Sequence, residues 1–217
     1  MGSKLKRDSA ILWAKKILIC SISLVILGFG CGLNIATAKG ADPITVFYEG
    51  LNKLTGISID WVTWILNGSL VLLVFFINKK YVHIGTVIYV LVLGSSIKAA
   101  LVIYGLLHIP HNFFIELIVS IIGCILCFIG IGGFMSIDIG IDPWTAVAII
   151  ASEKTKKPFK FIKIVFDTAT LLLGWAMGGK IGIITVLCAV IGGPLIQKSA
   201  EILDNLFSKM LKSSSEF

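Results

Sequence analysis

Charged residues are scarce in this chain, and that scarcity decides its class. Only 14% of the 217 residues are Asp, Glu, Lys or Arg, against about 25% in ordinary soluble domains. Hydrophobic residues make up 57% and the mean hydropathy is +0.98. A transmembrane helix needs about 20 apolar residues, so the length allows at most about six or seven spans and no sizeable soluble domain. We therefore expect an integral membrane protein whose main partner is lipid.

The motifs of the common catalytic sites are also missing. The chain has no H-E-x-x-H, G-x-S-x-G, Walker or Rossmann pattern, and no nucleophile and base stand in a recognisable order. The formal charge of +7 comes from 19 basic and 12 acidic residues, and in a membrane protein such an excess reports topology rather than a nucleic-acid partner. We predict neither an enzyme nor a nucleic-acid-binding protein, and no cofactor.

Six apolar stretches are long and continuous, which is typical of transmembrane helices rather than of β-barrel strands with their period of two. They cover residues 14–38, 58–77, 84–107, 112–137, 161–178 and 181–203. The expected organisation is a cytoplasmic N-terminal segment, two units of three helices and a C-terminal tail. The corresponding boundaries are 1–13, 14–107, 112–203 and 204–217.

Basic residues are distributed unevenly between the loops. With the N-terminus placed inside, only Lys39, Lys53, Lys98 and Lys180 fall elsewhere, which leaves 15 of the 19 basic residues on the inner side. Cytoplasmic loops carry an excess of Lys and Arg. The count predicts cytoplasmic termini at both ends and an even number of spans.

The second half of the chain repeats the first at an offset of 100 residues. The pattern G-x-G-x7-G-x-D-P-x-T begins at Gly30 and again at Gly130, which indicates a duplication. Each copy holds three apolar stretches, so the second copy would enter the membrane from the opposite side. The sequence thus predicts an all-α membrane protein of six transmembrane helices in two inverted repeats, as in many secondary transporters. A bundle that duplication merely enlarged is the alternative.

Each copy carries an Asp-Pro pair after its first span. Asp is a favoured N-cap and Pro a favoured first helical residue, so short helices are predicted to begin at Pro43 and Pro143. Non-helical backbone at membrane depth is tolerated where it lines a cavity or is buried in protein. The short helices and the loops before them either line a transport pathway or simply connect two spans. They could be re-entrant or lie at the membrane interface. The candidate gating residues are Asp42, Pro43, Thr45, Asp142, Pro143, Trp144 and Thr145.

Polar residues inside the spans suggest a central site. Asn67 and Asp167 lie mid-span and are related by the offset of 100 residues. Lys98 is the expected counter-ion of Asp167, and after a one-residue slip in the later part of the repeat Gln197 corresponds to Lys98. Ionisable residues inside a membrane are functional by default, although a buried Asp–Lys pair could merely set helix register. The predicted substrate-binding set is Asn67, Lys98, Asp167, Gln197, Asn34 and Asp138.

The cysteines all lie within apolar stretches. They are Cys20, Cys31, Cys124, Cys127 and Cys188. A Cys-x-x-Cys spacing on a transmembrane helix is more typical of packing than of redox or metal chemistry. No metal site is predicted.

The segment from Gly130 to Thr145 has the sequence GIGGFMSIDIGIDPWT. It resembles the G-x-x-P-W signature that follows a glycine-rich span in the YczE/YyaS/YitT family of bacterial integral membrane proteins, with Gly140, Pro143 and Trp144 carrying the match. The strings LLGWAMGG, GIITV and GGPLIQ further along are also similar to that family. The resemblance implies an all-helical protein of the bacterial plasma membrane and names no substrate.

Three functions are compatible with these patterns. The first is a secondary transporter of a small molecule, with a cationic or zwitterionic solute or proton coupling through Asp167 as the smallest extrapolation. The second is a substrate-binding membrane subunit of a larger importer, which would copurify with a partner ATPase. The third is a regulatory or structural membrane protein without transport. A homodimer is compatible with each of them.

Overall fold

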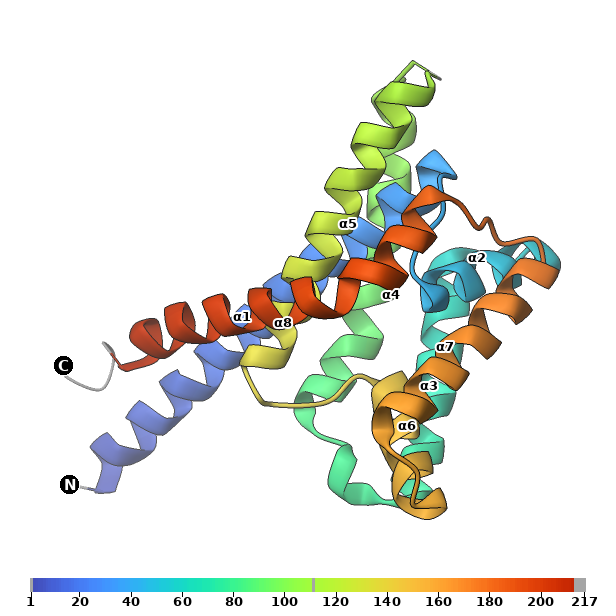
Figure 1. The fold of residues 1–217 in the computed structure, drawn as a ribbon. Helices are drawn as coiled ribbons and strands as arrows, with labels where there is room; N and C mark the ends of the chain where they lie inside the picture. Colours follow the sequence, from blue (N-terminus) through green and yellow to red (C-terminus); the bar gives the residue numbers. More distant parts are fainter. Residues whose placement is uncertain (1, 111, 213–217) are drawn as a thin grey trace.

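The structure is a computed structural model that describes residues 2–110 and 112–212, with side chains from residue 10 to 210; the end of the predicted tail, 213–217, lies outside the described residues. All regular structure in these residues is helical (Figure 1). The elements are α1 (Gly2–Thr37), α2 (Pro43–Thr55), α3 (Ile59–Ile77), the 3-10 helix η1 (Lys79–Tyr81), α4 (Ile84–Leu106), α5 (Phe113–Ser136), α6 (Pro143–Thr155), α7 (Phe159–Ala176) and α8 (Ile183–Lys212).

Each of the six predicted apolar stretches forms a helix. Within the described residues, α1, α3, α4, α5 and α8 are long and apolar enough to cross a membrane. The remaining one, α7, has 18 residues and contains Lys160, Lys163 and Asp167, which is too much charge for an unambiguous span. Large side chains on the outer faces are exposed, such as Phe76 at 80% and Phe114 at 72%. Such surfaces belong in lipid, and the protein is a multi-pass membrane protein.

The centre of the fold is the crossing of α1 and α5, where glycines replace side chains. A Cβ atom on Gly30 would lie 2.5 Å from the carbonyl oxygen of Gly123, and one on Gly130 would lie 2.5 Å from the amide nitrogen of Leu27. Small residues allow membrane helices to approach this closely. The two glycines that begin the repeated pattern therefore hold the central helix pair together.

The other helices surround this pair in a matching arrangement. Helix α1 packs on α4, as α5 packs on α8. The short helix α2 lies against α7, and α6 lies against α3, so each short helix contacts a long helix of the other half of the chain. In Figure 1 these four helices form a group beside the central crossing.

The two short helices begin where the Asp-Pro pairs predict. The Asp42 carboxylate accepts a hydrogen bond from the Thr45 amide at 3.2 Å, and the Asp142 carboxylate accepts one from the Thr145 amide at 2.9 Å. Pro occupies the first turn in both helices. The local sequence alone accounts for these helix starts, because a side-chain cap and a preset φ need no distant partner.

The loops that lead into the short helices are held by the opposite half of the chain. The Ile184 amide donates to the Lys39 carbonyl oxygen at 3.2 Å, and the Gly85 amide donates to the Ile139 carbonyl oxygen at 3.0 Å. Lys39 and Ile139 correspond at the offset of 100 residues, and Gly85 and Ile184 correspond at 99, because the later part of the repeat is shifted by one residue. The two hydrogen bonds therefore join corresponding positions of the two halves. Each half therefore fixes the entry to the other half's short helix.

Threonines next to these contacts bond the same loops. The Thr185 hydroxyl accepts from the Ala41 amide at 3.2 Å, and the Thr86 hydroxyl donates to the Ile141 carbonyl oxygen at 2.9 Å. Thr86 and Thr185 also correspond in the repeat, and each bonds the loop before the other half's short helix.

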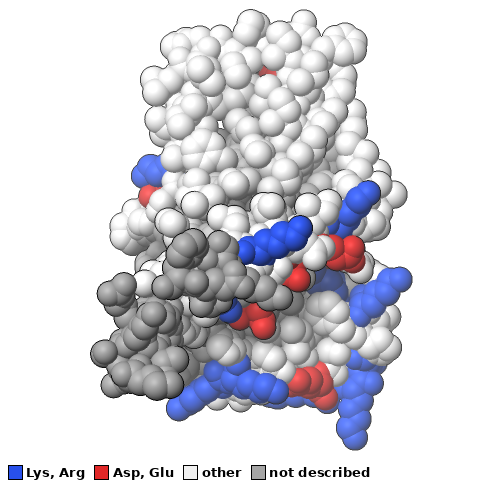
Figure 2. All heavy atoms as spheres, turned by 90° about the vertical axis from the view of Figure 1, so that its left-hand side faces the viewer, with Lys and Arg blue, Asp and Glu red and all other residues white. Residues whose placement is uncertain are grey.

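Charged side chains gather toward one end of the molecule. Figure 2 shows Lys and Arg over the lower half of one face, with the upper half nearly free of charge. In Figure 1 the η1 turn and the connection between α6 and α7 lie at the lower end, and the turn between α4 and α5 lies at the opposite end.

Tyr81 of η1 donates a hydrogen bond to the Glu153 carboxylate of α6, and this bond, with partial desolvation, raises the pKa of Tyr81.

Candidate functional site

A cavity of about 370 Å³ lies between the two halves of the chain. This volume is within the range of small-molecule sites, which is roughly 300–1,000 Å³. Hydrophobic side chains from α1, α4 and α5 form much of its wall, including Leu27, Leu93 and Phe134. Its polar and charged lining consists of Asp42, Thr45, Tyr48, Tyr89, Asp142, Thr145 and Lys163.

Both Asp-Pro caps border this cavity. Asp42 uses Oδ2 to cap α2, and Asp142 uses Oδ1 to cap α6. Each carboxylate therefore retains one oxygen that is not engaged in capping. Both aspartates are half-buried, so the two free oxygens are accessible to a ligand yet partly shielded from water.

Lys163 is a cation in the lining, and Asp167 balances it. The Lys163 Nζ lies 2.7 Å from the Asp167 carboxylate one helical turn further along α7. The two side chains are 29% and 31% exposed. Asp167 therefore contacts the lining residue Lys163 and is not itself part of the lining.

A buried hydrogen-bonded cluster lies at one side of the cavity. The Asn67 Oδ1 accepts from the Tyr48 hydroxyl and from the Trp144 Nε1, both at 3.0 Å. Trp144 also donates to the Tyr48 hydroxyl oxygen at 2.8 Å. None of the three side chains is more than 4% exposed. The cluster joins α2 and α3 of the first half to α6 of the second.

The sequence missed Tyr48, although a signal for it was present. Tyr48 lies one turn after Thr45 on α2. Its side chain is therefore on the same face of the helix as Thr45, and both residues line the cavity. The other predicted gating residues, Pro43 and Pro143, form the first turns of the short helices and are half-buried and buried. Four of the predicted gating residues line the cavity, whereas none of the predicted substrate-binding residues does. The four are Asp42, Thr45, Asp142 and Thr145.

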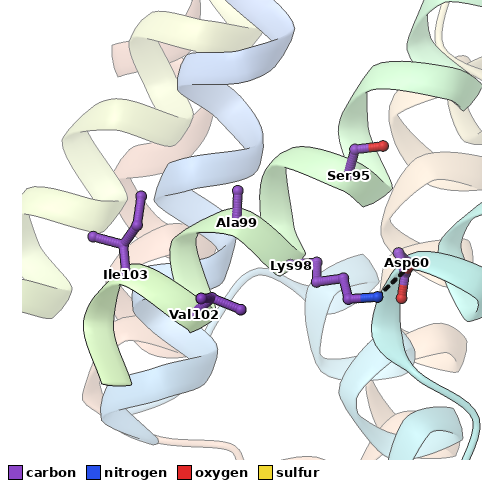
Figure 3. Close-up of a pocket in the computed structure, with 6 residues that line it drawn as sticks. All are labelled: Asp60, Ser95, Lys98, Ala99, Val102 and Ile103. Carbon is purple, nitrogen blue, oxygen red and sulfur yellow. Dashed lines mark hydrogen bonds and ion pairs between the residues drawn. The ribbon is translucent and has the colours of Figure 1, made fainter. Parts of the chain in front are cut away.

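The predicted pair of Lys98 and Asp167 is wrong. Lys98 Nζ lies 2.9 Å from the Asp60 carboxylate instead, in a shallow groove of about 460 Å³ that Ser95 also lines (Figure 3). The reason is helix packing, because α4 contacts α1 and α3 whereas α7 contacts α2 and α6. The Lys98 side chain is 52% exposed and the Asp60 side chain 8%. This groove is apart from the central cavity.

Three other predicted substrate-site residues also lie outside the cavity. Gln197 is exposed and bonds Glu201 on its own helix at 3.3 Å, because Ile196 takes the cavity-facing position one residue earlier. Asn34 is buried at 1% exposure between α1 and α5, where neither amide atom has a hydrogen-bond partner. Asp138 is exposed in the α5–α6 connection with a φ of 52°.

The corrected pairing has a thermodynamic consequence. In a double-mutant cycle, Lys98→Met and Asp60→Asn should show a coupling energy of about 0.5–1 kcal/mol, at the lower end for contacting residues because the lysine is half-exposed. Lys98→Met and Asp167→Asn should be additive, since no contact joins them. Unfolding in detergent micelles measures both cycles, and coupling in the second cycle alone would contradict the observed packing.

Comparison with known proteins places the chain in a family. A family model described as "Family of unknown function (DUF6198)" matches residues 14–200. The chain belongs to this family. The match extends from α1 into α8 and so includes both short helices and every residue that lines the cavity.

Two relatives are similar along most of their length. An uncharacterized protein of Haemophilus influenzae is 26% identical over 198 residues, covering 90% of this chain and 89% of the relative. The uncharacterized membrane protein YczE of Bacillus subtilis is 25% identical over 177 residues, covering 81% of each chain. No solved structure matches the chain. The resemblance to YczE-like membrane proteins is confirmed.

Proposed function

We propose that the protein is a secondary transporter and that the cavity between its halves is the substrate site. The observation that carries this proposal is that Asp42 and Asp142, which correspond under the 100-residue offset, line one cavity. Transporters built from inverted repeats bind substrate at the repeat interface, where discontinuous helices end. The short helices α2 and α6 begin at this cavity in the same manner.

An inverted arrangement of six spans is part of the proposal. It is supported by the matching contacts of the two halves, in which each half binds the loop before the other's short helix. With α7 as the sixth span, the basic η1 turn and the α6–α7 connection lie on one side, together with both ends of the chain. By the positive-inside tendency this side is the cytoplasm of a bacterial cell.

The lining favours a small organic cation. Because Asp167 pairs with Lys163, the carboxylates of Asp42 and Asp142 are left as the uncompensated charges of the lining, and the site attracts a cation. Tyr48 and Tyr89 add aromatic rings, and aromatic faces attract cations. An anion would meet the half-buried carboxylates of Asp42 and Asp142, and that repulsion is costly at low dielectric.

The buried cluster supplies a candidate gate. Because Trp144 joins α6 of the second half to Tyr48 and Asn67 of the first, the two halves cannot separate at this side of the cavity without breaking its hydrogen bonds. Alternating access requires such a contact to open on one face and close on the other. In this proposal, proton coupling is assigned to the Lys163–Asp167 pair, which borders the cavity through Lys163.

Flux into proteoliposomes tests the proposal. Small organic cations should accumulate, and anions of matched size should not. Thr145→Trp should stop uptake because the larger side chain fills the cavity, while the Asp142 cap persists since it bonds the backbone amide of that residue. The control is Ser95→Trp, in the groove beside Lys98, which should transport normally. Equal uptake by both variants, or no cation flux in the unaltered protein, would refute a transport site here.

A further inference from the structure

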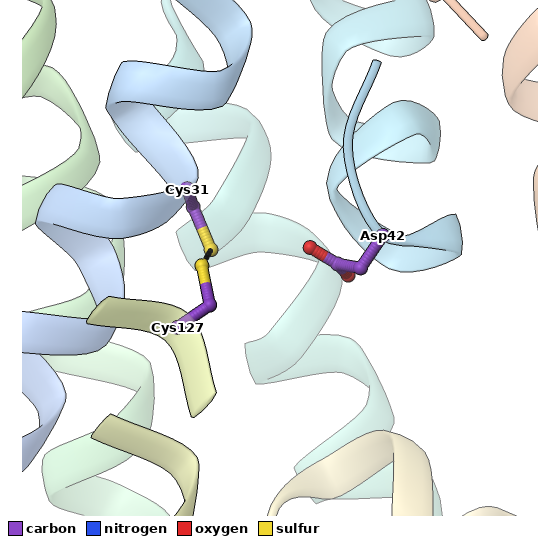
Figure 4. Close-up of side chains that lie close together, drawn as sticks. All are labelled: Cys31, Asp42 and Cys127. Carbon is purple, nitrogen blue, oxygen red and sulfur yellow. Dashed lines mark hydrogen bonds between the residues drawn. The ribbon is translucent and has the colours of Figure 1, made fainter. Parts of the chain in front are cut away.

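Two buried thiols and a carboxylate converge at the edge of the cavity. Cys31 of α1, Cys127 of α5 and Asp42, the cap of α2, place one ligand atom each within 4.8 Å of one another. Figure 4 shows the three side chains pointing toward one another, two from helices and Asp42 from the coil that leads into α2. Both cysteines are 5% exposed. Cys31 and Asp42 also line the cavity, so an ion could reach the cluster from it.

The spacing of the two sulfur atoms fits a tetrahedral metal ion. The Sγ atoms of Cys31 and Cys127 are 3.7 Å apart. Zinc–sulfur bonds of about 2.3 Å at a tetrahedral angle require two sulfurs to be about 3.8 Å apart, and a zinc-bound carboxylate oxygen at about 2.0–2.2 Å would lie about 3.5 Å from each sulfur. The sulfur pair already has this separation, and a movement of the Asp42 carboxylate toward the two sulfur atoms would complete the triangle.

We propose that Cys31, Cys127 and Asp42 form a binding site for a thiophilic divalent cation of the zinc and cadmium type. Two thiolates and one carboxylate are ligands that these ions prefer, and three protein ligands leave a fourth position open toward the cavity. On binding, each thiol exchanges its proton for a sulfur–metal bond, and two protons are released to water through the cavity. The sulfur and metal oxidation states do not change.

The proposed metal site does not depend on transport, but it shares Asp42 with the cavity lining. Because Asp42 is common to the cluster and to the cavity lining, a bound metal should compete with an organic cation for that carboxylate. Binding itself requires no flux, so the site can fail while the transport proposal stands, and the reverse also holds.

Cadmium titration of the reduced, detergent-purified protein provides the test. Cadmium–thiolate bonds have a charge-transfer band in the ultraviolet, and we expect one equivalent to bind with such a band and to be displaced by zinc. Cys31→Ser and Cys127→Ser should each lower the affinity more than about 100-fold, since even second-shell changes cost roughly 10–100-fold. Asp42→Asn should keep the band and weaken binding.

The chain contains a matched control pair of thiols. Cys124 and Cys188 have Sγ atoms 3.1 Å apart, yet no carboxylate belongs to their group among the described residues. The double variant Cys124→Ser, Cys188→Ser should therefore bind cadmium normally. Loss of binding in this control with retention in both single variants at positions 31 and 127, or no cadmium band in the unaltered protein, would overturn the proposal. A disulfide between Cys31 and Cys127 that resists reduction of the purified protein, detected by mass spectrometry, would overturn it as well.

Discussion

Replacing Asp42 and Asp142 together with asparagine should abolish organic-cation uptake in a protein that still folds. Asparagine is as good an N-cap as aspartate, so α2 and α6 should keep their first turns. The substitutions remove two negative charges from the cavity and leave Lys163 as the only charged residue in its lining. Hydrogen bonds to a charged group contribute about 1.5–3 kcal/mol each. Each single variant should therefore bind a transported cation about 10–100-fold more weakly, and the double variant should show no measurable uptake.

The control for this experiment is Asp138→Asn. Asp138 lies four residues before Asp142 in the same α5–α6 connection, but it is exposed and does not line the cavity. Uptake by this variant should equal that of the unaltered protein. If it were impaired as strongly as the double variant, the effect would come from overall charge rather than from the cavity, and the proposed site would be wrong.

Substituting alanine for Gly130 should cause a large loss of stability, because the added methyl group meets the backbone of α1. The new Cβ would lie 2.5 Å from the amide nitrogen and 2.7 Å from the Cα atom of Leu27. Backbone atoms cannot rotate away, so α1 and α5 would have to separate along the central crossing. Overpacking of this kind costs typically about 1–3 kcal/mol, and we expect the upper end of that range.

A glycine in open surroundings is the matched control. No atom lies within 4 Å of the position that a Cβ would take on Gly68 of α3. Gly68→Ala should be neutral or stabilising by up to about 1 kcal/mol, because alanine has the higher helix propensity. Thermal or detergent-induced unfolding of both variants distinguishes the cases. Equal stability would mean that the α1–α5 contact is looser than the structure has it.

The helices and their ends could be predicted because their causes are local. A continuous apolar stretch forms a helix in a membrane to satisfy its own backbone, whichever neighbours it has. The helix starts after Asp42 and Asp142 depend only on a cap and a proline one residue later. The glycine pattern was visible as a repeat, although its role in the close contact of α1 with α5 was not.

The site depended on which helices pack together, and the sequence alone does not decide that. Depth in the membrane suggested that Lys98 would meet Asp167, but α4 and α7 pack on different neighbours, and Asp60 lies closer. The direction of a side chain around its helix axis also mattered, since it places Ile196 rather than Gln197 in the cavity wall.

The sequence by itself determined the class of the protein, the helical segments, the duplicated motif and the family resemblance, because composition, periodicity and capping act over a few residues. Only the tertiary structure decided that the two Asp-Pro caps border one cavity and that Cys31 and Cys127 lie beside Asp42. Such groupings join residues far apart in the chain, and they arise from the packing of whole helices against one another.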